Sequence, residues 1–224
     1  MSGGVRDRMP SDEEGLLELL GGPRGLIDAG VPGAVFALAF SLTGRQLGVS
    51  LAAAVGSAAV LFVLALIQRR SVQQAVVGLL GIAVMAAFAA LTGQAKNFFL
   101  PSVLKNGAYA AVYLVSVLVR WPLLGVMVGP LFGEGFAWRD DPPRMRAYSM
   151  ASLVWAGMFA SRLLVQLPLY LAGQVGALGA VAIPLGLPLF LPTLWITFAI
   201  LRRTPPTRQQ PAGEPVPPAI PDAD

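Results

Sequence analysis

The sequence predicts an all-α, polytopic membrane protein with six spanning helices and one glycine-rich segment that is re-entrant or interfacial. Three observations predict this fold. The 224 residues are 55% hydrophobic and only 12% charged, whereas soluble domains carry about 25% charged residues. Only fourteen charged residues lie between Leu26 and Leu201, most of them in short clusters. The apolar stretches between these clusters approach the ~20 residues that a transmembrane helix needs.

Residues 1–24 are expected to form a cytoplasmic tail that contains one short amphipathic helix. The segment from Ser11 to Glu14 has the S-x-x-E form of a capping box. Leucines follow it, and Gly21-Gly22-Pro23 is expected to end the helix. The tail lacks the order of regions that marks a signal peptide, so we expect it to be retained. A disordered acidic tail is the alternative.

Seven apolar segments follow the tail, and the positive-inside rule decides how many of them cross. The segments are 26–43, 47–67, 72–91, 102–119, 121–138, 148–171 and 177–201. If all seven cross from a cytoplasmic N-terminus, six Lys and Arg residues lie inside and nine outside. If 121–138 does not cross, twelve lie inside and three outside. The sequence therefore favours six crossings with both termini cytoplasmic, and seven ordinary crossings remain the alternative.

The composition of 121–138 also predicts that it does not cross. It contains four glycines, two prolines and a glutamate, and irregular backbone is tolerated at membrane depth only where protein or water satisfies its polar groups. The glycines at 125, 129, 133 and 135 are spaced so as to permit close helix approach.

The last apolar segment is expected to be kinked or broken near Gly186. Pro184, Pro188 and Pro192 recur every four residues there, and each removes a backbone donor. The proline-rich residues 204–224 are expected to form a disordered cytoplasmic tail. Residues 25–203 are thus predicted to form a single membrane domain.

A stripe of polar and aromatic residues is predicted within 148–171. Arg162 lies well inside this segment, where a cation costs roughly 2.5–3.5 kcal/mol on insertion scales. Gln166 and Tyr170 follow at i+4 and i+8, and Trp155 precedes at i−7, so the stripe should face the other helices.

Glu134 is the only acidic residue well inside an apolar stretch, and we expect it to pair with Arg162. Three interpretations of Arg162 remain open. The pair, or a bond from Arg162 to backbone carbonyls of the broken segment near Gly186, could fix the helix arrangement. Arg162 could instead line an anion, proton or solute site, or its side chain could extend to an interface.

Asp28 stands at the beginning of the first apolar segment. It is expected to be the N-cap of the first helix, with Pro32 in the first turn; a proton-carrying role is the alternative. Lys96, Asn97, Lys105 and Asn106 are expected in a solvated outer loop, or else in an extracellular vestibule. Around Arg144, alternating Asp and Arg residues are expected to form local ion pairs and lipid contacts; these are Arg139, Asp140, Asp141, Arg144 and Arg146.

Composition excludes several chemistries. The chain has no cysteine and no histidine, which removes thiolate nucleophiles, histidine bases and the usual zinc and haem ligands. No paired carboxylates are evident, so we expect no cofactor, no metal and no enzymatic activity. The net charge is +4, but the arginines stand beside apolar segments, which indicates contacts with lipid headgroups and not with nucleic acid.

Residues across 21–203 carry a resemblance to a known family. They are Lys105-Asn106, Arg120 to Gly125, Gly133-Glu134-Gly135, Trp138-Arg139, Phe159, Arg162, Val165 to Gly173, Leu189-Phe190 and Leu194-Trp195. This pattern resembles an uncharacterised actinobacterial integral-membrane family, a domain of unknown function. The order of segments is also distantly similar to the intracellular-septation (YciB-type) inner-membrane proteins. The resemblance implies a multi-pass protein of the bacterial cytoplasmic membrane.

Two classes of function follow from the sequence. The first is a non-enzymatic scaffold or accessory protein of the cell envelope, whose partners are the lipid bilayer and other envelope membrane proteins. The second is a small-solute, ion or proton permease with a polar cavity around Arg162.

Overall fold

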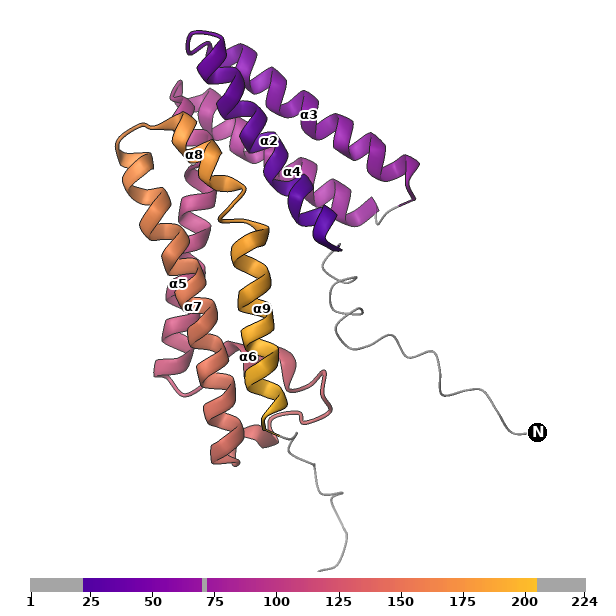
Figure 1. The fold of residues 1–224 in the computed structure, drawn as a ribbon, viewed down its shortest axis with the longest axis vertical. Helices are drawn as coiled ribbons and strands as arrows, with labels where there is room; N and C mark the ends of the chain where they lie inside the picture. Colours follow the sequence, from indigo (N-terminus) through magenta and orange to yellow (C-terminus); the bar gives the residue numbers. More distant parts are fainter. Residues whose placement is uncertain (1–21, 70–71, 205–224) are drawn as a thin grey trace, which may run out of the picture. The chain divides into compact units, whose positions relative to one another are not determined.

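The computed structural model describes residues 22–69 and 72–204, and the regular structure of these residues is entirely helical (Figure 1). The α-helices are α2 (Gly22–Leu42), α3 (Leu47–Ile67), α4 (Val72–Thr92), α5 (Leu100–Leu118), α6 (Leu123–Val128), α7 (Pro142–Leu171), α8 (Val175–Ala182) and α9 (Leu187–Arg202). Two 3-10 helices join them, η1 (Ala95–Phe98) and η2 (Ala137–Arg139). The amphipathic helix predicted in the N-terminal tail and the C-terminal tail from residue 205 onwards lie outside the described residues.

Among the described residues, three helices are long and apolar enough to cross a membrane, namely α3, α4 and α7. The bent pair α8 and α9 makes a fourth candidate if it is taken as one span. The count falls short of the six predicted spans for two reasons. In α5, Lys105 and Asn106 lower the hydropathy of a helix of 19 residues. In α2, the described apolar part, Gly30–Leu42, is shorter than a span.

Large apolar side chains are exposed along α3 and α4. They include Val55, Val60, Val63, Ile67, Val77, Leu80 and Val84. A soluble protein rarely exposes so much contiguous apolar surface, whereas lipid tails accept it without cost. The two helices therefore suit a lipid environment.

The segment 121–138 forms no helix of membrane-spanning length. Its α-helix, α6, has six residues, and turns and η2 make up most of the remainder. Pro122 lacks an amide donor at the start of α6, and Gly129 and Pro130 follow its end. The alternative of seven ordinary crossings is therefore wrong.

The break predicted near Gly186 is confirmed. Helix α8 ends at Ala182 and α9 begins at Leu187, with a bend of 43° between them. Pro184 and Pro188 flank Gly186, and neither can donate a backbone hydrogen bond. The chain therefore interrupts its helical hydrogen bonding at this point.

Residue contacts divide the chain into two compact units. Among the described residues, the first comprises 22–69, 72–111 and Ala156–Trp195, and the second comprises Val112–Trp155 and 196–204. In the first unit, α2 packs against α3 and α8, and α3 packs against α4 (Figure 1).

The core of the first unit is built from aromatic and small residues. The rings of Phe36 and Phe98 stack with centroids 4.1 Å apart, and both side chains are fully buried. In α8, a Cβ added at Gly179 would lie 2.1 Å from the Cβ of Ala37. Gly179 is therefore required for the close approach of α8 to α2.

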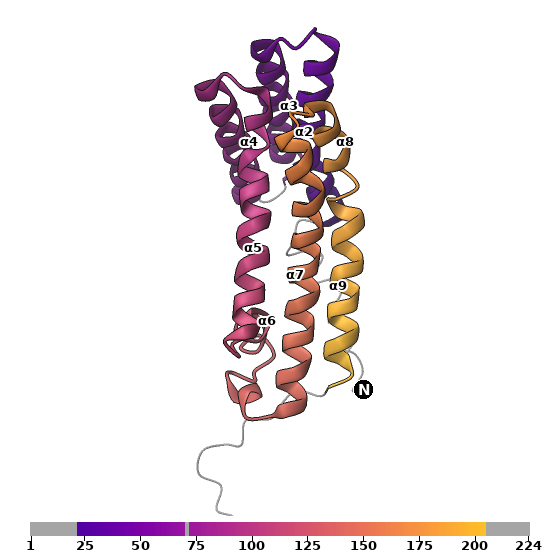
Figure 2. The same ribbon diagram turned by 90° about the vertical axis from the view of Figure 1, so that its left-hand side faces the viewer.

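Helices α5 and α7 run side by side within the first unit (Figure 2). Asn106 bonds to Gln166, the Leu163 side chain lies 3.6 Å from a Cβ built at Gly107, and the rings of Tyr109 and Phe159 lie 5.0 Å apart. Because the position in α7 falls as the position in α5 rises, the two helices are antiparallel.

Candidate functional site

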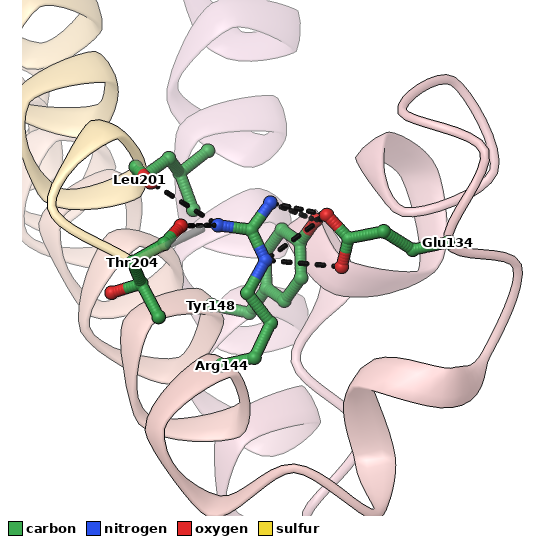
Figure 3. A network of polar contacts seen from close by, with 5 residues as sticks. All are labelled: Glu134, Arg144, Tyr148, Leu201 and Thr204. Atoms are coloured by element: carbon green, nitrogen blue, oxygen red, sulfur yellow. Dashed lines mark hydrogen bonds and ion pairs between the residues drawn. The ribbon is translucent and has the colours of Figure 1, made fainter. Parts of the chain in front are cut away.

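The most buried charged residues of the described chain lie in the second unit. Glu134 stands in the turns between α6 and η2 with its side chain fully buried, and Arg144 stands in the first turn of α7 with 2% of its side chain exposed. Tyr148 follows Arg144 at i+4, hence on the same face of α7, and is also fully buried. Figure 3 shows the three side chains pointing toward one another.

Arg144 and Glu134 form a multiply bonded ion pair. Arg144 Nε donates to both carboxylate oxygens at 3.0 Å, and Nη2 makes a further short bond to Oε1. The Tyr148 hydroxyl accepts from Arg144 Nη2 at 3.2 Å and donates to Glu134 Oε1 at 3.2 Å. Charge-assisted bonds of this kind are roughly twice as strong as neutral ones.

Another edge of the guanidinium binds the last turn of α9 and Thr204, two residues beyond the end of this helix. Arg144 Nη1 donates to the Leu201 carbonyl at 3.1 Å and to the Thr204 carbonyl at 2.6 Å (Figure 3). The last carbonyls of a helix lack intrahelical donors and carry the negative end of its dipole. A cation at this position therefore both satisfies these carbonyls and is stabilised by them.

These contacts use every donor of Arg144. A guanidinium has five N–H groups, and Glu134, Tyr148, Leu201 and Thr204 provide acceptors for all of them. We call these five residues the Arg144 cluster. The cluster therefore holds three chain segments together, and its arginine has no N–H group without an acceptor.

The glycine-rich segment encloses a tryptophan beside the Arg144 cluster. Trp138 is fully buried, and its ring meets Tyr148 edge-on with centroids 5.5 Å apart. A Cβ added at Gly125 would lie 3.0 Å from the Trp138 ring, and one added at Gly129 would lie 2.7 Å from Trp138 Nε1. The glycines at 125 and 129 therefore make room for the Trp138 side chain. The sequence had instead suggested that they permit close approach between helices.

The predicted pair between Glu134 and Arg162 is wrong. Glu134 binds Arg144, which precedes Arg162 by 18 residues of the same helix, or five turns. Arg162 instead donates from Nη2 to the carbonyl of Gly186 at 2.9 Å, in the break between α8 and α9, as the alternative bond to the broken segment predicted. The alternating charges around Arg144 did not indicate that this arginine is buried. The signal that could have indicated it is Tyr148 at i+4, an aromatic residue on the same face of the helix.

The remaining residues of the predicted stripe each contact another part of the chain. Gln166 is buried, and its Oε1 accepts from Asn106 Nδ2 at 2.8 Å. The Tyr170 hydroxyl donates to Asn97 Oδ1 at 2.6 Å. In the second unit, Trp155 Nε1 donates to Thr197 Oγ1 at 3.0 Å.

The outer polar residues are not all in a solvated loop as expected. Asn97 lies in η1 and Asn106 in α5. Both side chains are buried, and each binds a residue of α7. The ammonium of Lys96 lies 5.4 Å from the centroid of the Tyr170 ring. Lys105 remains exposed.

Asp28 is not the N-cap of the first membrane helix. Helix α2 begins at Gly22, so Asp28 lies inside it, and Pro32 lies beyond the first turn. The apolar pattern placed the start of this helix too late because Gly22 and Pro23 suggested a terminus. The side chain of Asp28 lies outside what the structure describes.

No group of three or more metal-binding acidic side chains occurs among the residues that the structure describes. The candidate functional groups are thus the saturated Arg144 cluster in one unit, and the polar residues of α5 and α7 around Arg162 in the other.

Comparison with known proteins gives one match. No curated protein and no solved structure shows significant similarity to the chain. The model of one family, described as "Protein of unknown function (DUF3159)", matches residues 20–208. This match includes every helix that the structure describes. The chain therefore belongs to the DUF3159 family of proteins of unknown function.

Proposed function

We propose that the protein is a multi-pass protein of the bacterial cytoplasmic membrane that acts as a non-enzymatic scaffold or accessory protein for other envelope membrane proteins. The resemblance in segment order to intracellular-septation proteins, which is an expectation from the sequence, implies such a role. The observation that carries the proposal is the saturation of Arg144, whose donors all bind protein groups. The most buried charges of the described chain are thus used to hold its segments in place.

The held segment presents an aromatic and basic surface. Trp121, Phe132 and Phe136 expose 40%, 48% and 53% of their surface, and the guanidinium of Arg139 lies 4.1 Å from the centroid of the Trp121 ring. Aromatic residues and arginine are the types enriched in protein interfaces. We propose that this surface, which we call the Trp121 face, binds a second integral membrane protein at the level of the lipid headgroups.

Six crossings with both termini cytoplasmic remain our proposal for the topology. Helices α2 and α5 have 21 and 19 residues, or about 28–32 Å of rise, which matches a hydrocarbon core of about 30 Å. With this topology twelve Lys and Arg residues lie inside and three outside.

The absence of cysteine makes this topology directly testable. Single cysteines at Thr43 and Gln94 should react with a membrane-impermeant maleimide in intact cells, and single cysteines at Asp140 and Arg203 should react only after permeabilisation. Labelling of Asp140→Cys in intact cells would contradict the proposed topology.

Site-specific cross-linking tests the scaffold role. A photo-reactive amino acid at Phe136 should give an adduct with a distinct membrane protein in cells, and the same probe at exposed Leu80 of α4 serves as the matched control. The adduct should be lost in Arg144→Leu, because the Trp121 face is then no longer held in place. Adducts with lipid alone at Phe136 would contradict the scaffold role.

A permease is the second candidate, and one observation favours it. Arg162 Nε is buried without a hydrogen-bond partner, so this arginine, unlike Arg144, has a donor that no protein group binds. Proteoliposomes with the wild type and with Arg162→Leu test this candidate, with thermal melting to show that the variant is folded. Flux that is lost only in the variant would favour transport over the scaffold role.

A further inference from the structure

We propose that Arg162 and Lys105 form a binding site for a phosphate-type oxyanion, supplied either as free phosphate or by a phospholipid headgroup. The proposal does not depend on the scaffold role, and it supplies a ligand class for the second candidate function. It rests on the hydrogen bonding of Arg162, on the position of Lys105 and on the lack of Asp and Glu in 30–111 and 156–195.

The hydrogen bonds of Arg162 are incomplete. Nη2 is held by the Gly186 carbonyl at 2.9 Å, and this carbonyl also accepts from the backbone N–H of Phe190 at 3.1 Å. Nε is buried and has no partner. A buried donor without an acceptor costs roughly as much as a lost hydrogen bond. The guanidinium is thus oriented by one bond, while another of its donors is buried and has no acceptor.

A second cation lies nearby on α5. The contacts of Asn106 with Gln166 and of Gly107 with Leu163 fix the register of α5 against α7, and Lys105 directly precedes this contact region. Gln166 lies one turn of α7 from Arg162, so this register places Lys105 within about two turns of Arg162 along the helix pair, where like charges repel. An anion between them would convert this repulsion into two attractions.

The chain segments that surround Lys105 and Arg162 in the sequence contain no acidic residue that could neutralise these two cations. Neither 30–111 nor 156–195 contains an Asp or a Glu, whereas these ranges hold six Lys and Arg residues. Glu134, which the sequence suggested as the partner of Arg162, is bound by Arg144. Of the acidic residues in the first unit, Asp28 is the nearest in sequence to the described core, and its role is tested below.

The chemistry of the two side chains selects the ligand. The planar fork of an arginine matches two oxygens of a phosphate or carboxylate, and a lysine acts as a point charge on a flexible stem. One arginine and one lysine together neutralise about two negative charges, which suits phosphate better than a single carboxylate.

Ligand-dependent thermal melting of the full-length protein in detergent tests the site. Inorganic phosphate, at constant ionic strength, should raise the melting temperature of the wild type by several degrees. The shift should disappear in Arg162→Gln and decrease in Lys105→Gln. Arg203→Gln, which removes an exposed cation from the end of α9, should keep the full shift.

Mixed micelles identify the source of the phosphate group. Phosphatidic acid should raise the melting temperature and diacylglycerol should not, if a lipid headgroup is the ligand. A response to inorganic phosphate alone identifies a free anion. Either response supports the site, provided that it depends on Arg162.

Further variants keep the test decisive. If Arg162→Gln does not fold, Arg162→Lys retains the charge without the fork and should show a smaller shift than the wild type. The proposal is overturned if neither phosphate nor phosphatidic acid causes a shift that depends on Arg162 or Lys105. It is also overturned if Asp28→Asn lowers the melting temperature as much as Arg162→Gln does while phosphate has no effect, because Asp28 is then the counter-ion. Cross-linking at Phe136 should be unchanged in Arg162→Gln, so failure of this site is distinguishable from failure of the scaffold role.

Discussion

Arg144 binds the carboxylate of Glu134 with one side of its guanidinium and the Leu201 and Thr204 carbonyls with the other. This relationship joins the start of α7, the glycine-rich segment and the end of α9 in one polar cluster that leaves no donor unused. A buried ion pair is not by itself strong evidence of stability, because desolvation offsets much of its attraction. Its breakage, however, leaves a buried charge without compensation.

Loss of one partner of the Arg144 cluster should therefore strongly destabilise the protein. We expect Arg144→Leu and Glu134→Gln each to lower the free energy of unfolding by about 3–5 kcal/mol. Replacement of both by apolar residues should cost less than the two single changes added together. Thermal and denaturant unfolding in detergent measure these effects. Arg146→Gln, in the same turn but exposed, should change stability by less than about 0.5 kcal/mol; an equal loss in this control would contradict the assignment.

Gly179→Ala should separate α8 from α2. The added methyl group would overlap Ala37, so we expect a loss of about 1–3 kcal/mol. Ala37→Gly in the same chain should restore most of this loss. Gly78→Ala in α4, where no atom lies within 4 Å of the added Cβ, should be neutral or stabilise by about 0.5–1 kcal/mol. Denaturant unfolding compares the variants, and equal effects of both glycine changes would refute the close approach.

The bond between Asn106 and Gln166 should behave as a buried polar pair. Gln166→Leu leaves Asn106 Nδ2 without an acceptor, which should cost about 1–3 kcal/mol. A variant with leucine at both positions should cost less than the sum of the single changes. Gln94→Leu changes an exposed glutamine that makes no capping bond and should have little effect. Additive losses in a double-mutant cycle would show that the two side chains do not interact.

Removal of the Tyr170 hydroxyl tests the contact between α7 and η1. Tyr170→Phe keeps the ring beside Lys96 but leaves Asn97 Oδ1 without its 2.6 Å bond. We expect a loss of about 0.5–1.5 kcal/mol. Amide exchange around η1 should increase at the same time, and unchanged exchange there would indicate that the bond does not hold η1 in place.

The sequence predicted the helical class and the interruptions better than it predicted the polar contacts. Prolines and glycines act on their own backbone, so the break near Gly186 and the absence of a long helix over 121–138 followed from local chemistry. The partner of Glu134 could not be found in this way, because Arg162 and Arg144 are both cations on α7. Only the three-dimensional path of the glycine-rich segment, which returns to the first turn of α7, selects Arg144.

A hydropathy pattern also could not predict how many helices are apolar enough to span a membrane, or which asparagines are buried. Lys105 and Asn106 make α5 less apolar than α3 or α4, and hydropathy does not reveal that the buried Asn106 donates from Nδ2 to Gln166. The start of α2 was placed too late for a related reason, since Gly22 and Pro23 are compatible with either the end of one helix or the beginning of another.

Hydrogen–deuterium exchange of residues 123–139 in the wild type and in Arg144→Leu, below the melting temperature of both, tests the central claim most directly. If the Arg144 cluster holds this segment in place, its amides and those at the end of α9 should exchange faster in the variant, while the amides of α3 remain unchanged. Equal exchange of 123–139 in the two proteins would show that the segment is held by other contacts and would contradict this account.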